Sequence, residues 1–110
     1  MAHFRKAARA AVDLKARFRR DGARFTLERS ARMSDLSVGG AFLHDSALEV
    51  GARLVIWVTA PSAWEPLELL AEVRWTRDEG VGVAFRSVNK TQATALRALV
   101  DAVGYARETR

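Results

Sequence analysis

Hydrophobic and polar side chains alternate with a period of two along most of the first 87 residues. In the clearest run, residues 67–77, single residues separate Leu69, Ala71, Val73 and Trp75. Such alternation indicates a strand with one face toward a core, and it places Trp75 on the same face as Val73. Six strands are predicted, at residues 10–20, 25–33, 41–43, 54–59, 67–77 and 81–85.

Turn-forming residues occupy the gaps between these runs. Asp21-Gly22 is typical of a two-residue hairpin, in which glycine accepts a positive φ. Residues 44–52 are predicted to form a connector, and residues 60–66, which contain both prolines, a loop. Asp78-Glu79-Gly80 turns the chain before the last strand. These short connections favour strands that run antiparallel to their neighbours.

The hydrophobic period becomes helical after Ser87. The apolar positions at helical spacing are Ala93, Leu96, Leu99, Val100 and Val103. Asn89 and Gln92, three residues apart, resemble a capping box, and Gly104 is expected to end the helix. The chain is therefore predicted to be mostly β, a six-stranded antiparallel β-barrel with a C-terminal α-helix over one open end.

Composition limits what kind of protein this is. The chain has 110 residues, 49% of them hydrophobic, which suits one small core and leaves no room for a second. No apolar run approaches the roughly 20 residues of a membrane span, and the start lacks a signal-peptide h-region. With no cysteine, disulfides and thiolate metal sites are excluded, and His3 and His44 lack partners at metal spacing. We expect a cytoplasmic protein without membrane insertion, metal or cofactor.

Positive charge is concentrated near the N-terminus. The net charge is +5, from 18 basic and 13 acidic residues. Residues 1–24 hold eight basic and two acidic side chains, so the remainder holds ten and eleven and is nearly neutral. Nucleic-acid binders usually spread their positive charge over a groove. The uneven distribution favours a compact anionic ligand.

Two segments carry the candidate chemistry. In the first, residues 33–43, Asp35 and Ser37 would share one face of a strand, and Gly39 and Gly40 leave room for a flat ligand. A carboxylate beside a hydroxyl suits the donor-rich edge of guanine. The same residues could instead hydrogen-bond their own backbone in a turn.

The second segment is an N-terminal arm, residues 1–9, in which Arg5 and Arg9 are four residues apart. Arginine forks bind phosphate and can reach the acceptor pair on the other edge of guanine. An arginine pair by itself is more often a pair of solvated charges. The two segments together indicate a nucleotide clamp.

With these two motifs in this order, the chain resembles the PilZ domain, a bacterial receptor module for cyclic di-GMP. That family pairs an Arg-x-x-x-Arg lead-in with a later Asp/Asn-x-Ser-x-x-Gly turn, found here as Arg5-Lys6-Ala7-Ala8-Arg9 and Asp35-Leu36-Ser37-Val38-Gly39-Gly40. Val73-Arg74-Trp75 and Gly82-Val83-Ala84-Phe85 also resemble its last two strands. The resemblance covers nearly the whole chain.

The resemblance implies a role for each motif residue. Arg5 and Arg9 would contact the phosphates and the N7/O6 edge of guanine, folding the arm over the ligand. Asp35 would accept the N1 and N2 donors with help from Ser37, and Gly40, with Gly39 beside it, would let the purine approach.

Three further residues are secondary candidates. Phe4 precedes the first arginine, where family members that bind one ligand molecule differ from those that bind two. Lys6 lies between the arginines. Trp75, because it is expected on the face of Val73, is assigned to the core or the barrel rim rather than to a base-stacking platform.

We predict a cyclic di-GMP receptor without catalysis, in which residues 1–9 are a flexible arm on a single domain of residues 10–110. Ligand binding would order the arm, and a downstream protein partner would read the changed surface. One alternative is a PilZ-like adaptor that binds no nucleotide, against which the intact motifs argue.

Two other classes are ranked lower. A small basic barrel that binds nucleic acid would need aromatic side chains displayed among its outward Lys15, Arg17 and Arg19, and no exposed aromatic residue is expected among them. An enzyme would need a base oriented by a third group, which Asp35, Ser37 and His44 do not provide.

Overall fold

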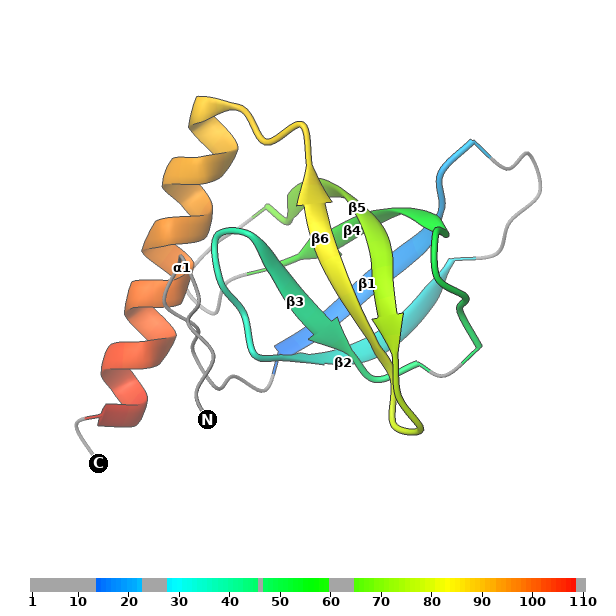
Figure 1. Ribbon diagram of the computed structural model, residues 1–110. Helices are drawn as coiled ribbons and strands as arrows, with labels where there is room; N and C mark the ends of the chain where they lie inside the picture. The colour runs from blue at the N-terminus through cyan, green and yellow to red at the C-terminus, as the bar shows by residue number, and fades with distance from the viewer. Residues whose placement is uncertain (1–13, 23–27, 46, 60–64, 109–110) are drawn as a thin grey trace.

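The computed structural model describes residues 14–22, 28–45, 47–59 and 65–108, with the backbone alone for 103–108. These residues form six strands and one helix (Figure 1). In chain order they are β1 (Leu14–Arg20), β2 (Arg29–Ser34), β3 (Gly40–Leu43), β4 (Arg53–Val58), β5 (Leu67–Thr76), β6 (Val81–Arg86) and α1 (Lys90–Glu108).

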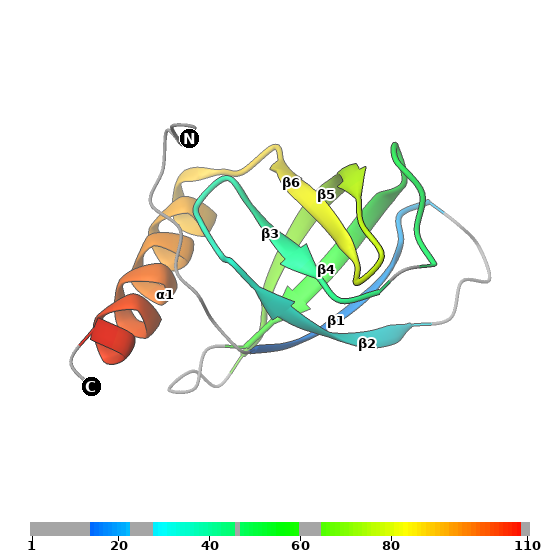
Figure 2. The same ribbon diagram turned by 60° about the horizontal axis from the view of Figure 1, so that its bottom comes forward.

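The six strands close into one antiparallel barrel. Their order around it is β1-β2-β3-β6-β5-β4, and β4 pairs with β1 to complete the ring. Closure gives every strand two partners, which removes the exposed edges of an open sheet. The helix lies beside the barrel next to the loop between β2 and β3 (Figures 1 and 2). The predicted six-stranded barrel with a C-terminal helix is confirmed.

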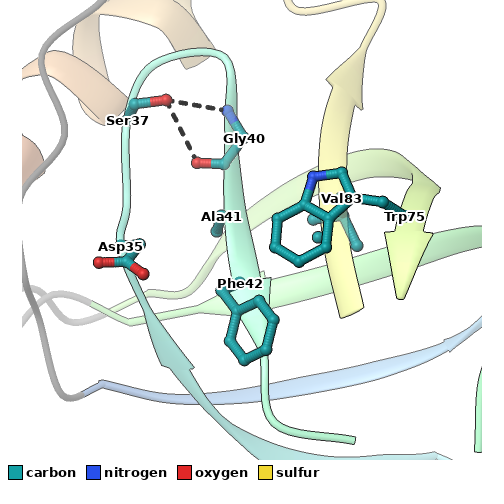
Figure 3. A pocket seen from close by; sticks show the side chains of 8 residues that line it. Asp35, Ser37, Gly40, Ala41, Phe42, Trp75 and Val83 are labelled. Atoms are coloured by element: carbon teal, nitrogen blue, oxygen red, sulfur yellow. Dashed lines mark hydrogen bonds between the residues drawn. The ribbon is translucent and has the colours of Figure 1, made fainter. Parts of the chain in front are cut away.

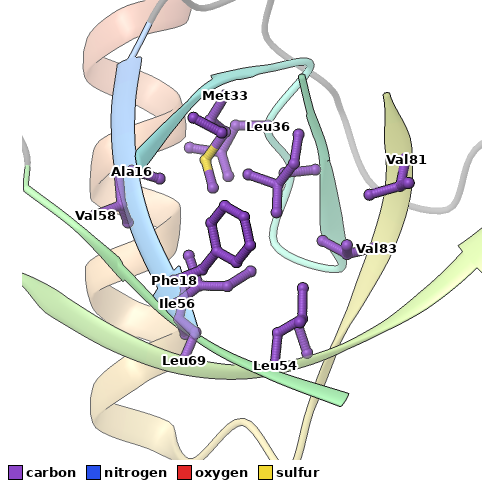
Figure 4. Packing of buried hydrophobic residues seen from close by; sticks show 14 of the residues in the cluster. Ala16, Phe18, Met33, Leu36, Leu54, Ile56, Val58, Leu69, Val81 and Val83 are labelled. Carbon is purple, nitrogen blue, oxygen red and sulfur yellow. The ribbon is translucent and has the colours of Figure 1, made fainter. Parts of the chain in front are cut away.

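The core fills the barrel because alternate residues of each strand point inward (Figure 4). Phe18 is 2% exposed, and Leu54 and Ile56 are fully buried. Leu36, from the loop between β2 and β3, is also fully buried and anchors that loop to the interior. The apolar stripe of α1 joins the same cluster through Leu96, Leu99 and Val100.

The helix begins as its sequence predicts. The Gln92 backbone N–H donates to Asn89 Oδ1 at 2.8 Å, and the Asn89 N–H donates to Gln92 Oε1 at 2.9 Å. This reciprocal pair is a capping box. Gln92 Nε2 also donates to the carbonyl of Glu68 in β5 at 2.8 Å, so the cap ties the helix to the barrel.

The predicted end of the helix is wrong, because α1 continues through Gly104 to Glu108. Glycine inside a helix costs only about 1 kcal/mol relative to alanine, so it weakens a helix without necessarily ending it. Within the described residues, no helix has both the length and the apolar character required to cross a membrane.

Asn89→Ala should lower the free energy of unfolding by about 1 kcal/mol, the usual contribution of an N-cap side chain. The variant loses the acceptor for the Gln92 N–H and loosens the cap that holds Glu68. Urea denaturation followed by circular dichroism measures the change. Thr94→Ala, an exposed position on the same helix, is the control. Equal stability of the two variants would contradict a role for the cap.

The predicted two-residue hairpin at Asp21-Gly22 is also wrong. Strands β1 and β2 pair with Phe18 opposite Arg29, so their connection is much longer. Gly22 has the expected positive φ of 80°, but the Asp21 N–H donates to the carbonyl of Arg53 at 2.8 Å. Pairing with β4 thus continues past β1. Residues 10–13 and 25–27 of the predicted first two strands lie outside the described residues.

Candidate functional site

A pocket of about 130 Å³ lies between the β2–β3 loop and the end of β5 (Figure 3). The loop provides two polar side chains, β3 and β6 provide the floor, and β5 provides an aromatic ring. The lining residues are Asp35, Ser37, Gly40, Ala41, Phe42, Trp75, Gly82 and Val83. A carboxylate, glycine backbone and flat rings are therefore brought to one place.

The loop that carries Asp35 is not a strand, although its side chains divide as predicted. Strand β2 ends at Ser34, and Asp35 has a φ of 54°, in the left-handed region. Aspartate is one of the few residues that enters this region readily, because its short polar side chain can bond locally. Leu36 points into the core, while Asp35 and Ser37 both line the pocket.

The Ser37 hydroxyl is occupied by its own turn. Ser37 Oγ accepts hydrogen bonds from the backbone N–H groups of Gly39 at 3.1 Å and Gly40 at 3.2 Å. The Ser37 backbone N–H donates to the Gly40 carbonyl at 2.9 Å. With 8% of its surface exposed, Ser37 shapes the loop that presents Asp35. This is the turn-forming arrangement that the sequence left open as an alternative.

The two adjacent glycines have different surroundings. A Cβ on Gly40 would lie 2.2 Å from the backbone carbonyl oxygen of Val83, so only glycine lets β3 and β6 approach this closely. A Cβ on Gly39 would meet nothing nearer than Ser37 Oγ at 3.9 Å. Gly40 lines the pocket, whereas Gly39 does not. The packing of β3 against β6 thus requires Gly40 of the motif whether or not a ligand binds.

Trp75 lies on the outside of the barrel, contrary to the predicted shared face with Val73. Val73 pairs with Val83 but Trp75 pairs with Gly82, which makes Arg74 an extra residue in β5. This β-bulge reverses the side on which the following residues point. Val73 is consequently fully buried, while Trp75 is 39% exposed.

The outward Trp75 ring crosses Gly82 and packs on its neighbours. It stacks on Phe42, with ring centroids 5.5 Å apart and an interplanar angle of 27°. The Arg77 guanidinium carbon lies 4.8 Å from the Trp75 ring centroid. His44 meets the other aromatic partner, Phe42, edge-on at 4.9 Å. The pocket therefore has a fixed aromatic wall.

Not every predicted site residue can be placed. Asp35, Ser37, Gly40 and Trp75 line one pocket, but the arm residues Phe4, Arg5, Lys6 and Arg9 lie outside the described residues. The sequence reasoning missed Phe42 and Gly82. Their signals were the outward position of an aromatic residue in a short strand and a glycine inside a strand, which often marks close packing.

Ser37 and His44 have separate hydrogen-bond partners. His44 Nε2 is 3.0 Å from Ser34 Oγ, whereas Ser37 Oγ is held by the backbone N–H groups of its own turn, so His44 is not placed to act as a base for Ser37. Among the described side chains, no cluster of three or more histidines or carboxylates is arranged to hold a metal ion.

Ion pairs fasten the barrel surface outside the pocket. Arg20 makes two hydrogen bonds of 2.8 Å to the Glu49 carboxylate, and these bonds lower the pKa of Glu49 and raise the pKa of Arg20. Because Glu49 is exposed, solvent screens the pair and its effect on stability is small. Arg29 pairs similarly with Asp45 at 3.1 Å.

Solved structures with the same architecture come from PilZ proteins. The PilZ domain of YcgR from Escherichia coli, determined with c-di-GMP, has a TM-score of 0.72 and 21% identity, and the match covers 97% of both chains. The PilZ domain of CeSA from a cellulose-synthesizing bacterium has a TM-score of 0.70 and 18% identity, with 86% of this chain and 96% of that one covered. At these identities the similarity shows the fold.

A longer protein also contains this fold. The Bacillus subtilis inhibitor of motility, MotI/DgrA, has a TM-score of 0.72 and 14% identity over 99% of this chain. The match covers 54% of MotI/DgrA, so this chain spans about half the length of that protein. Comparison with curated protein sequences finds no match.

The family profile of the PilZ domain matches residues 3–102. That range includes Arg5 and Arg9, the Asp35–Gly40 turn, all six strands and most of α1. By sequence profile and by fold, the chain belongs to the PilZ domain family.

Proposed function

We propose that this protein is a receptor for cyclic di-GMP that passes the signal to a protein partner. The observation that carries the proposal is the pocket, because it unites Asp35, the turn-forming Ser37 and Gly40, and the Trp75 ring. A carboxylate at the rim of a flat, partly apolar recess suits a guanine, whose N1 and N2 are both donors. Membership in a family that includes the c-di-GMP complex of YcgR supports the same ligand.

The size of the pocket favours a clamp. Its volume, about 130 Å³, is well below the roughly 300–1,000 Å³ of sites that enclose a whole small-molecule ligand. It suits one base, which leaves the phosphates and second guanosine outside. In the proposed complex, Arg5 and Arg9 of the arm, residues 1–9, cover those parts against the barrel of residues 10–110.

Isothermal titration calorimetry with cyclic di-GMP tests the proposal. Binding in the micromolar range or tighter is expected, with a favourable enthalpy offset by an unfavourable entropy because the arm becomes ordered. The titration also reports whether one or two ligand molecules bind. Absence of heat and of any thermal stabilisation by cyclic di-GMP would refute the receptor function.

Arg5→Ala and Arg9→Ala should each weaken cyclic di-GMP binding by about 1.5–3 kcal/mol, the usual scale of a charge-assisted contact. The melting temperature without ligand should barely change, because these arginines act on the ligand. Calorimetry measures the affinities. Lys6→Ala removes one positive charge from the same arm, so it is the matched control and should cost much less. Wild-type affinity in both arginine variants would contradict the proposal that Arg5 and Arg9 clamp the ligand.

The adaptor that binds no nucleotide remains the principal alternative. It shares the PilZ fold, and the same titration separates the two. The pocket with Asp35 among its lining residues favours the receptor.

One feature of the structure favours the nucleic-acid alternative, and another opposes it. Strand β4 places Trp57 beside β1, with the guanidinium groups of Arg17 and Arg19 at 5.6 and 5.8 Å from its ring. However, Trp57 Nε1 donates to Glu68 at 3.0 Å, and Arg17 pairs with Glu28. Carboxylates interleaved on this face would repel phosphates, so the receptor remains the better-supported function.

A further inference from the structure

Gly82, the second residue of β6, lies under the Trp75 ring. A Cβ built on Gly82 would lie 2.0 Å from Trp75 Cε2, 2.3 Å from Cζ2 and 2.5 Å from Nε1. Non-bonded carbon atoms pack at about 3.5–4.0 Å, so a methyl group here would push the indole outward by about 1.5 Å. The ring occupies the space that any side chain at this position would need.

Three features of the fold converge on this contact. The β-bulge at Arg74 turns Trp75 outward and pairs it with Gly82. On the other side of β6, Phe42 pairs with the same glycine, and its ring stacks on Trp75. An aromatic ring that lies across a strand glycine covers backbone that would otherwise be exposed, which explains why Gly82 is buried.

Gly82 differs in kind from the other close-packed glycines. A Cβ on Gly40 or Gly80 would meet a backbone carbonyl oxygen, at 2.2 and 2.1 Å. At Gly82 it would meet the outer part of a side chain that is 39% exposed. A substitution at Gly82 can therefore be relieved by moving the indole, whereas those at Gly40 and Gly80 require the strands to move.

We propose that Gly82 is a positioning residue that sets the location of the Trp75 ring in the pocket and thereby the affinity for one base of the ligand. The inference rests on the proposed cyclic di-GMP function. Phe42 and Gly82 hold the indole flat before ligand arrives, so a base that packs against it does not have to order it first. A displaced ring would narrow or tilt the recess.

Gly82→Ala should weaken cyclic di-GMP binding about tenfold, within the range for loss of a base–aromatic contact. Trp75→Ala should weaken it at least as much. In the Trp75→Ala background, adding Gly82→Ala should cause no further loss, because the alanine methyl group then has no ring to displace. Calorimetry on the two single variants and the double variant measures the coupling. A purely structural role for Gly82 would instead weaken binding equally in both backgrounds, which would overturn the proposal.

A measurement without ligand tests the position of the Trp75 ring separately from the proposed function. In the wild-type protein without ligand, the Hα protons of Gly82 should be shifted upfield in the NMR spectrum by the indole ring current, and Trp75→Ala should abolish the shift. Ordinary Gly82 Hα shifts would overturn the ring placement. Failure of the wild-type protein to bind cyclic di-GMP would instead overturn the proposed function, and with it the role of Gly82 in affinity. Wild-type affinity in Gly82→Ala, with binding intact, would overturn the inference alone.

Discussion

Gly40→Ala should destabilise the barrel by about 3 kcal/mol, at the upper end of the usual cost of overpacking a tight site. The added Cβ would lie 2.2 Å from the Val83 carbonyl oxygen and 3.3 Å from the carbonyl carbon. Both belong to the backbone of β6, so no side-chain rotation relieves the contact. Strands β3 and β6 must separate where they pair, with Gly40 opposite Ala84.

Thermal denaturation measures this loss. For a domain of this size, about 3 kcal/mol corresponds to a fall in melting temperature on the order of 15 °C. Ligand affinity should also fall, because the turn that closes on the Gly40 N–H and carbonyl carries Asp35.

Gly39→Ala is the matched control for this prediction. It adds the same methyl group one residue earlier, at an exposed position where only Ser37 Oγ lies within 4 Å, at 3.9 Å. Its effect should stay within about 0.5 kcal/mol, as for ordinary surface substitutions. If Gly39→Ala were as damaging as Gly40→Ala, the close approach of β3 and β6 would not be the reason for the motif glycine.

Cyclic di-AMP should bind on the order of 100-fold more weakly than cyclic di-GMP, because a polar group placed to read a donor strongly rejects an analogue that lacks it. Adenine presents an acceptor at N1 and has no N2 amine, so Asp35 would face a lone pair instead of two donors. Asp35 is only half-buried, so water can relieve part of the mismatch and the effect should be smaller than in a closed site.

Competition calorimetry with the two dinucleotides measures this selectivity. Asp35→Asn keeps an acceptor of the same size but removes the charge, and should lose part of the affinity for cyclic di-GMP. Asp21→Asn makes the same chemical change at an exposed carboxylate that does not line the pocket, and should bind like the wild type. Equal affinity of wild-type protein for both dinucleotides would show that Asp35 does not read the base.

Local sequence patterns were sufficient for most of the fold. Period-two alternation identified each strand because it reports which residues face the barrel interior, as with Leu69, Ala71 and Val73 in β5. The capping box at Asn89 and Gln92 was likewise readable, since both partners lie within one turn of helix. Such features depend on residues close together in the chain, so a single sequence contains them.

Candidate site residues were predictable where they lay within one short segment. Asp35 and Ser37 could be expected to act together because only Leu36 separates them, and its apolar side chain must face the core. Their association with Gly40 follows from the same turn. The roles of Arg5 and Arg9 in ligand binding stay predictions.

The features that the sequence could not predict depend on partner strands. The face of Trp75 is reversed by a bulge that exists only in the pairing of β5 with β6, and no local pattern marks Arg74 as the extra residue. Likewise, no local pattern showed that the Asp21 N–H bonds to the Arg53 carbonyl of β4. Alternation and caps are local properties of the chain, whereas register and close approach are relations between distant segments. The barrel and its loop chemistry were therefore determined by the sequence itself, and the aromatic wall and the packing need for Gly40 and Gly82 were decided only by the tertiary structure.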